Sequence, residues 1–325
     1  MIKLLSLLLL MISCANLRNK SSYDRELSGY KYPFSVKRRT FHSQKQELHM
    51  AYMDINSKGD KVAVLLHGKN FAGFYWKQIA LELQAAGYRV IIPDQIGFGK
   101  SSKPRNYQFS FYAMAAQTKD LLNDLGIKKA MIIGHSMGGM LATHFTYSYP
   151  DCVSKMILIN PIGLEPYLKY VEFKDPEFFF KNELAKTPAK AKAYQQKNYY
   201  DGKWDKKYDH LLEPYNKQMK GRDWEIVAWN NALTYGPIFN EDITTKFSSI
   251  ENPVVLIIGT RDKTGPGRGW KKPGVKRVLG DYKKLGKLAQ KSFMNAKLYE
   301  LPGLGHMPHF EDYNRFLPVF KKAIK

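Results

Sequence analysis

Residues 130–139 decide the fold, and they read Ala-Met-Ile-Ile-Gly-His-Ser-Met-Gly-Gly. The opening apolar run suits a strand buried on both faces of a parallel sheet, and the residues after Ser136 have helical spacing. Between them lies the pattern Gly-x-Ser-x-Gly, in which a sharp strand-to-helix turn lifts the serine above the sheet. Because this turn crowds its neighbours, Gly134 and Gly138 have to be small. The stretch therefore predicts a nucleophilic serine at the end of a buried strand.

Strand and helix signals alternate on both sides of this turn. Buried strands are predicted at 62–66, 89–93, 130–133, 156–159, 253–258 and 296–301, with helices at 74–86, 112–125 and 137–149. Two extended stretches, 36–41 and 47–53, are expected to form a hairpin at the sheet edge. The pattern predicts an α/β fold with a mostly parallel central sheet flanked by helices, whose strands end along one edge.

The alternation stops in the middle of the chain. Residues 164–245 are rich in aromatic and charged side chains and show no strand–helix rhythm. We therefore expect an inserted helical cap between two parts of the core, 31–163 and 246–325. Its aromatic residues, among them Trp224 and Trp229, either line a pocket for an apolar or aromatic substrate group or form the cap's own core.

A serine nucleophile needs a base, and the base needs an orienting carboxylate. In chains with this turn the order is serine, then acid, then histidine. Asp262 and His306 follow the last two predicted strands, so each falls at the same sheet edge as Ser136. These three residues are the predicted catalytic triad. His309 is the alternative base, and the alternative interpretation of Asp262 is that it is an aspartate of a surface turn without a catalytic role.

The developing oxyanion needs backbone N–H donors. The helix that follows Ser136 offers the N–H of Met137 together with its N-terminal dipole. A second donor is expected from the loop after strand 62–66, where Lys69 is the first choice and Asn70 the second. The Lys69 side chain has no predicted role. This chemistry requires no metal and no organic cofactor.

The order of these motifs resembles that of the α/β-hydrolases. The motifs are His67-Gly68, the Asp-Gln-Ile-Gly-Phe-Gly-Lys-Ser stretch at 94–101, the glycine-rich turn at 134–139, Gly-Thr-Arg-Asp at 259–262, and Gly305-His306. Over residues 35–325 the chain is similar to the cap-bearing branch that includes esterases, epoxide hydrolases, haloalkane dehalogenases and carbon–carbon bond hydrolases. The resemblance implies a serine hydrolase that acts on a small-molecule ester.

Several activities remain open within this resemblance. Epoxide hydrolases and dehalogenases of the family carry an aspartate at the turn, so Ser136 favours an acyl-enzyme route. The alternatives are a carbon–carbon bond hydrolase, an amidase or aminopeptidase, a lipase, an acyltransferase, and a non-catalytic binding protein of the same fold. The separation of Asp262 and His306 is longer than the family usually shows. We expect the extra residues, a 264–280 loop that includes Trp270, to lie near the mouth of the site.

The N-terminus has the features of a bacterial export signal. Residues 1–13 combine a lysine with an apolar run, and small residues follow. The run ends at Cys14 in a pattern that resembles a lipoprotein signal, although Met11 stands where leucine is usual. We expect Cys14 to be lipidated, 14–30 to be a tether, and the protein to reside in the cell envelope, otherwise in the periplasm or medium. Cys152 is then left without a disulfide partner.

The charge of the chain is strongly positive, at a formal net +22. Its lysines are scattered, and no helix-turn-helix, zinc-finger or RNA-binding signature is present, so nucleic acid is not the expected partner. Two interpretations remain: a solvated lysine-rich surface, or a surface that supports a lipid anchor on an anionic membrane.

Cys14→Ser tests the anchor. One acyl chain binds a membrane marginally, and nearby basic residues each add about 1 kcal/mol on an anionic surface. We expect the substitution to move the protein from the membrane fraction to a soluble or uncleaved form, measured by fractionation and N-terminal mass. A wild-type protein that is already soluble, with an N-terminus other than modified Cys14, would contradict the prediction.

Overall fold

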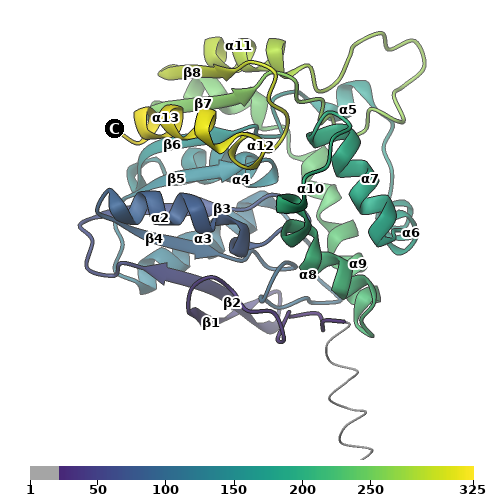
Figure 1. The fold of residues 1–325 in the computed structure, drawn as a ribbon, viewed down its shortest axis with the longest axis horizontal. Helices are drawn as coiled ribbons and strands as arrows, with labels where there is room; N and C mark the ends of the chain where they lie inside the picture. Colours follow the sequence, from purple (N-terminus) through teal and green to yellow (C-terminus); the bar gives the residue numbers. More distant parts are fainter. Residues whose placement is uncertain (1–21) are drawn as a thin grey trace, which may run out of the picture.

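The central feature of the computed structural model, which describes residues 22–325, is an eight-stranded sheet (Figure 1). Its strands lie in the order β1-β2-β4-β3-β5-β6-β7-β8. Their bounds are β1 Val36–Ser43, β2 Gln46–Ile55, β3 Lys61–Leu66, β4 Tyr88–Pro93, β5 Ala130–His135, β6 Val153–Ile159, β7 Val254–Gly259 and β8 Ala296–Leu301. The predicted α/β fold with a mostly parallel sheet is confirmed.

Antiparallel pairing is confined to one edge of the sheet. β1 pairs with β2 and β2 with β4 in antiparallel register, and every pairing from β3 to β8 is parallel. The hairpin strands run further than the sequence predicted, because they extend to a two-residue turn at Gln44 and Lys45. Both turn residues have positive φ, 49° and 61°, which matches the twist of a tight hairpin.

Helices cover both faces of the sheet. One face carries α2 (Lys77–Ala85) and α13 (Tyr313–Ile324), and the other carries α3 (Phe111–Asp124), α4 (Met137–Ser148) and α11 (Tyr282–Ser292) (Figure 1). Successive strand side chains point to opposite faces, so the apolar strands feed two separate cores. Leu66 and Ile132 pack on the α3–α4 side, whereas Leu65 and Ile133 pack on the α2–α13 side.

The inserted region between β6 and β7 is helical, as predicted. Its helices are α5 Tyr167–Tyr170, α6 Pro176–Leu184, α7 Pro188–Tyr199, α8 Asp209–Met219, α9 Trp224–Leu233 and α10 Tyr235–Asn240. They lie together beside the core (Figure 1). Short 3₁₀ turns occur at Gly73–Trp76, Pro150–Cys152, Lys206–Tyr208 and Ile243–Ser249, and α12 (Pro308–Glu311) precedes α13.

Trp224 and Trp229, for which the sequence left pocket lining and cap core open, both belong to the packing of this region. Trp224 packs edge-on against Tyr215, with ring centroids 5.3 Å apart. Trp229 packs against Phe180, and its Nε1–H donates to the Arg105 carbonyl at 2.7 Å. Neither tryptophan lines the cavity that contains Ser136, so the packing interpretation is the one that describes both residues.

The segment before the hairpin rests on the inserted helices. The predicted signal peptide, Cys14 and the tether as far as residue 21 lie outside the described residues. From residue 22 onward, Leu27 is buried in the core and the N–H of Tyr23 donates to the Lys217 carbonyl of α8 at 3.1 Å. The part of the predicted tether that is described thus packs against the protein. No helix within 22–325 is long and apolar enough to cross a membrane.

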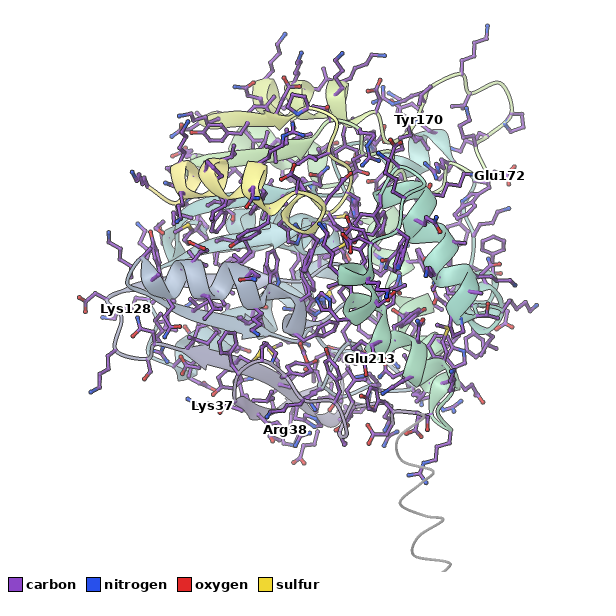
Figure 2. The ribbon with its side chains drawn as sticks, viewed as in Figure 1. Lys37, Arg38, Lys128, Tyr170, Glu172 and Glu213 are labelled. Carbon is purple, nitrogen blue, oxygen red and sulfur yellow. The ribbon has the colours of Figure 1, made fainter. Side chains whose placement is uncertain are left out.

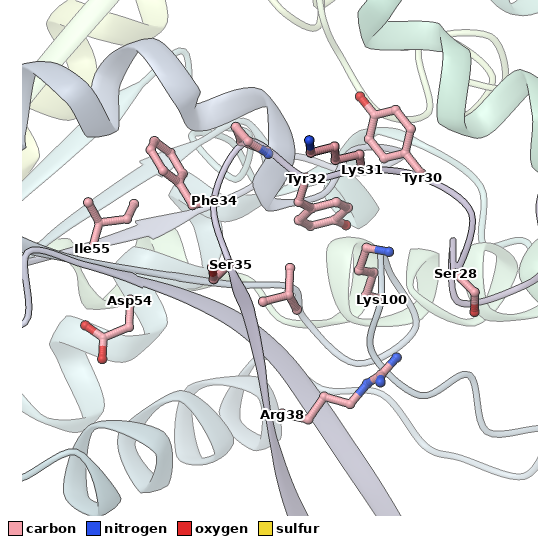
Figure 3. A pocket seen from close by; sticks show the side chains of 12 residues that line it. Ser28, Tyr30, Lys31, Tyr32, Phe34, Ser35, Arg38, Asp54, Ile55 and Lys100 are labelled. Atoms are coloured by element: carbon pink, nitrogen blue, oxygen red, sulfur yellow. The ribbon is translucent and has the colours of Figure 1, made fainter.

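An open groove lies beside the β1 edge of the sheet. Lys37 and Arg38 are neighbouring exposed cations on β1, and Lys128 is an exposed cation in the connection between α3 and β5 (Figure 2). The groove, of about 860 Å³, follows residues 28–36 and is bordered by Arg38 and Lys100 (Figure 3). None of the predicted catalytic residues borders this groove.

The turn between β5 and α4 is held by steric crowding. Ser136 has φ 56° and ψ −120°, a strained conformation for a residue with a side chain. A Cβ on Gly134 would lie 2.1 Å from the carbonyl oxygen of Gly138, and one on Gly138 would lie 2.0 Å from that of Leu66. Only glycine fits these positions, because the obstructing atoms belong to the backbone.

Gly138→Ala therefore tests how strictly the turn is packed. We expect loss of the folded state or a large drop in melting temperature, since α4 would have to move away from β3. Gly236→Ala in α10 is the matched control, because no atom lies within 4 Å of its added Cβ. Because Gly236 precedes Pro237, alanine there brings no helix-propensity gain, but it should cost far less than alanine at Gly138. Equal melting temperatures for the two variants would contradict the packing argument.

Candidate active site

The structure brings the three predicted catalytic residues together in one hydrogen-bonded chain. Ser136 follows β5, Asp262 follows β7 and His306 follows β8, so the parallel sheet places all three at its carboxyl edge. His306 Nε2 lies 2.9 Å from Ser136 Oγ, and His306 Nδ1 lies 2.6 Å from Asp262 Oδ2. Ser136 is 8% exposed, whereas His306 and Asp262 are only 1% and 2% exposed. Nucleophile, base and carboxylate thus stand in the order that acyl transfer requires.

The Asp262 carboxylate is held by one donor from its own loop and one from the loop after β6. Thr264 N–H donates to Oδ1 at 2.8 Å, and Asn160 Nδ2 donates to Oδ2 at 2.9 Å. Asn160 itself follows β6, and its Oδ1 accepts the N–H of Gly259 at 2.8 Å. These donors aim the carboxylate at His306. Sequence reasoning assigned Asn160 no such role, although its place at the end of a strand was a signal that could have found it.

The two histidines that flank the triad are structural. His309, the alternative base, stacks on Trp76 with centroids 5.5 Å apart, and its ring nitrogens have no partner within residues 22–325. Burial lowers its pKa to about 3, and the charge of His306 acts in the same direction. Burial also places the pKa of His135 well below its ordinary value. Both rings are therefore neutral at physiological pH, and the structure favours His306 over His309 as the base.

A hydrogen-bond relay that the sequence did not reveal ties the site together. The N–H of Gly68 donates to Tyr75 Oη at 3.0 Å, and that hydroxyl lies 3.1 Å from His135 Nδ1. On the far side of the ring, His135 Nε2–H donates to the His306 carbonyl at 2.9 Å. Because Tyr75 and His135 join three loops that are remote in sequence, they fix the position of His306 relative to the serine turn.

Candidate oxyanion donors lie on both sides of Ser136. Met137 opens α4, so its N–H belongs to the first turn, where no intrahelical acceptor exists. Lys69 and Asn70 follow β3 and line the same cavity as Ser136. Asn70 has φ 66°, which turns the loop sharply at this point. Gly68 is excluded as a donor, since Tyr75 takes its N–H. The choice between Lys69 and Asn70 stays open.

The cavity above Ser136 has a volume of about 520 Å³. The inserted helices supply Tyr194, Tyr199 and Tyr235 to its wall, and the 264–280 loop supplies Trp270. The ring of Tyr199 also packs against His306, with centroids 4.7 Å apart. The cavity can therefore take a mostly apolar or aromatic small molecule. Across residues 22–325 we find no cluster of His, Cys, Asp and Glu arranged to hold a metal ion.

Comparison with known proteins defines the class. A family model described as the alpha/beta hydrolase fold matches residues 62–313, and the chain therefore belongs to that family. The sequence is 28% identical over 223 residues to a 2-hydroxy-6-oxononadienedioate/2-hydroxy-6-oxononatrienedioate hydrolase of Burkholderia vietnamiensis, which covers 68% of this chain and 77% of the relative. The protein is thus a hydrolase of the α/β fold.

Solved structures extend the comparison. A probable hydrolytic enzyme from Pseudomonas aeruginosa PAO1 superposes with a TM-score of 0.91 and 38% identity, covering 94% of this chain and 98% of that one. A thermophilic esterase from Thermogutta terrifontis shares the fold with a TM-score of 0.65 and 19% identity, covering 89% and 98%.

His309→Phe tests whether this ring is buried in its neutral form. In the unfolded chain His309 binds a proton below about pH 6.5, whereas in the folded protein it binds one only below about pH 3. The free energy of unfolding therefore decreases as the pH falls from about 6.5 to 3. One such group contributes a slope approaching ~1.4 kcal/mol per pH unit. Phenylalanine should flatten the dependence of unfolding free energy on pH, measured by urea denaturation from pH 3.5 to 7. His42→Asn, at an exposed site, is the control. An unchanged slope in His309→Phe would contradict the neutral-ring account.

Proposed function

We propose that the protein is a serine hydrolase that cleaves a carboxylic ester through an acyl-enzyme. The observation that carries this proposal is the chain of contacts from Ser136 Oγ through His306 to Asp262, at 2.9 and 2.6 Å. The tight turn between β5 and α4 supports the proposal, because it presents Ser136 to the cavity while the neighbouring residues stay buried. A binding protein of this fold would have no use for a base oriented in this way.

The reaction proceeds in two steps. His306 Nε2 accepts the proton of Ser136 as Oγ attacks the ester carbonyl, and it returns that proton to the leaving alcohol when the carbon–oxygen bond breaks. Water activated by His306 then hydrolyses the acyl-enzyme and frees the serine. The backbone N–H of Met137 and one from Lys69 or Asn70 stabilise the negative oxygen in both steps.

Asp262 acts through His306. Its carboxylate accepts the Nδ1–H, which leaves Nε2 free to accept from Ser136, and it stabilises the imidazolium that forms. Thr264 and Asn160 keep the carboxylate aimed at the ring. No step requires a metal or an organic cofactor.

Hydrolysis of a carbon–carbon bond is the second candidate. It is favoured by the similarity to the Burkholderia relative, whose name describes a hydrolase of hydroxy-oxo-dienedioates. The two candidates share the triad and differ in the group that leaves, an alcohol in one case and a carbanion in the other. Assaying one enzyme sample with an aryl ester and with a vinylogous 1,5-diketone distinguishes them.

The cellular setting that we propose is the bacterial envelope. A lipid on Cys14 would hold the protein at a membrane, and the net charge of +22 would strengthen its attachment to anionic lipid. The substrate then reaches the cavity from outside the cytoplasm.

Ser136→Ala and Asp262→Asn test the mechanism. The first should abolish ester turnover while the melting temperature stays near that of the wild type, because only one oxygen is lost. The second should lower kcat by roughly 10³–10⁴, since the amide favours the wrong His306 tautomer. Asp151→Asn, at an exposed site, should leave kcat unchanged. Near-normal turnover in Ser136→Ala would overturn the assignment of the nucleophile, and near-normal turnover in Asp262→Asn would point to another carboxylate.

A further inference from the structure

The wall of the active-site cavity carries only one sign of charge. Among its lining residues are Lys69, Lys186, Lys190 and Arg268, whereas no aspartate or glutamate lines it. The rest of the lining is mostly aromatic and aliphatic. A cavity of this kind attracts anions, because field lines from charges of one sign concentrate in a cleft with low-dielectric walls.

One buried carboxylate lies behind this wall and neutralises part of the charge. Both oxygens of Glu183 lie 2.7 Å from Lys186 Nζ, and Tyr215 Oη donates to one of them at 2.8 Å. Burial raises the pKa of Glu183, but the charges of Lys186 and Lys69 outweigh burial and hold that pKa below its ordinary value. Glu183 is therefore an anion and compensates Lys186.

The Lys69 side chain has its own arrangement. Its Nζ donates to the Asn231 carbonyl at 2.6 Å and lies 4.2 Å from the ring centroid of Tyr235. Burial lowers its pKa to about 7, so the charge of Lys69 is only partly present at neutral pH. A negative group in the cavity would raise the pKa of Lys69 and so favour its protonated form.

Two cations at the mouth of the cavity have no carboxylate partner. Lys190 Nζ donates to the Ala185 carbonyl at 2.9 Å. Arg268 donates to the Lys263 carbonyl at 2.6 Å and to the side-chain oxygen of Asn198. No carboxylate oxygen within residues 22–325 lies inside 4.0 Å of either charge. The charge of both residues is thus available to a ligand.

The positions of these groups set the geometry of a ligand. Ser136 is almost buried where it lines the cavity, whereas Lys190 and Arg268 are exposed lining residues, so we take the two cations as the rim of the cavity. A molecule whose ester reaches Ser136 can therefore extend toward these two cations, one from α7 and one from the loop after β7.

We infer that the substrate is an amphipathic ester with an anionic group, a carboxylate or a phosphate, at the end remote from the scissile bond, and that Lys190 and Arg268 bind this group. The inference rests on the proposed ester hydrolysis and adds the class of substrate. Arg268 suits such a group because its planar guanidinium can donate two parallel hydrogen bonds to a carboxylate or phosphate.

Matched esters test the inference. One set consists of p-nitrophenyl esters whose acyl chains end in a carboxylate, a phosphate or a methyl group, in short and long versions; the other places the same ends in the alcohol part. In at least one set, we expect the long anionic ester to exceed its methyl counterpart at least tenfold in kcat/KM. The short anionic ester should show a smaller preference, because it does not reach the rim. Preference for carboxylate over phosphate, or the reverse, identifies the anion.

Variants assign the preference to the two cations. Lys190→Gln combined with Arg268→Gln should lower the ratio of anionic to neutral kcat/KM about tenfold. Lys197→Gln is the matched control, because this residue lies on the same helix but does not line the cavity, and it should leave the ratio unchanged. Added salt should lower the wild-type ratio, since exposed charges are screened.

The outcomes separate this inference from the proposed function. Hydrolysis of the neutral esters that is lost in Ser136→Ala supports the serine hydrolase even if no anionic preference is seen. Equal kcat/KM for anionic and neutral esters in both sets, or an anionic preference that survives the double variant, would overturn the anion site. Absence of ester hydrolysis altogether, with the folded wild-type protein, would overturn the proposed function and the inference with it.

Discussion

The close approach of α4 to β3 is the constraint on which the rest of the structure depends. The backbone of Gly138 packs directly against the carbonyl of Leu66, with no space for a methyl group. This contact allows the chain to reverse within one residue, Ser136, whose φ of 56° is otherwise costly. It also sets the first turn of α4 beside the loop after β3. Nucleophile and oxyanion donors therefore derive their relative positions from a single backbone contact.

The parallel sheet supplies the remaining parts of the site. Asp262 and His306 follow the last two strands, and neither is near Ser136 in the sequence. Because parallel strands end at one edge, their loops meet there, and hydrogen bonds from Asn160 and His135 then orient them. The functional groups are thus positioned by the sheet to within a few ångströms, and by buried polar contacts to within hydrogen-bond distance.

The fold and the triad positions could be predicted from the sequence because their signals are local. Apolar runs mark the strands, and the glycines around Ser136 mark the turn. The roles of Tyr75 and Asn160 could not be predicted, since each depends on a partner from a distant loop. The role of Trp229 also depends on a distant partner. Its aromatic side chain would suit the wall of a pocket, but its indole N–H donates to the Arg105 carbonyl. The packing of Leu27 was missed because its polar neighbours suggested a solvated tether.

The central claim is that Ser136 is the nucleophile of an acyl-enzyme. Its most direct measurement is peptide mapping of the folded protein after reaction with a fluorophosphonate, which mimics the tetrahedral intermediate. Trypsin releases residues 130–155 as one peptide, which contains both Ser136 and Cys152. The account predicts one adduct per chain, localised by fragmentation to Ser136. An adduct on Cys152 or on a different peptide would contradict the account, and so would the absence of any adduct on a correctly folded sample.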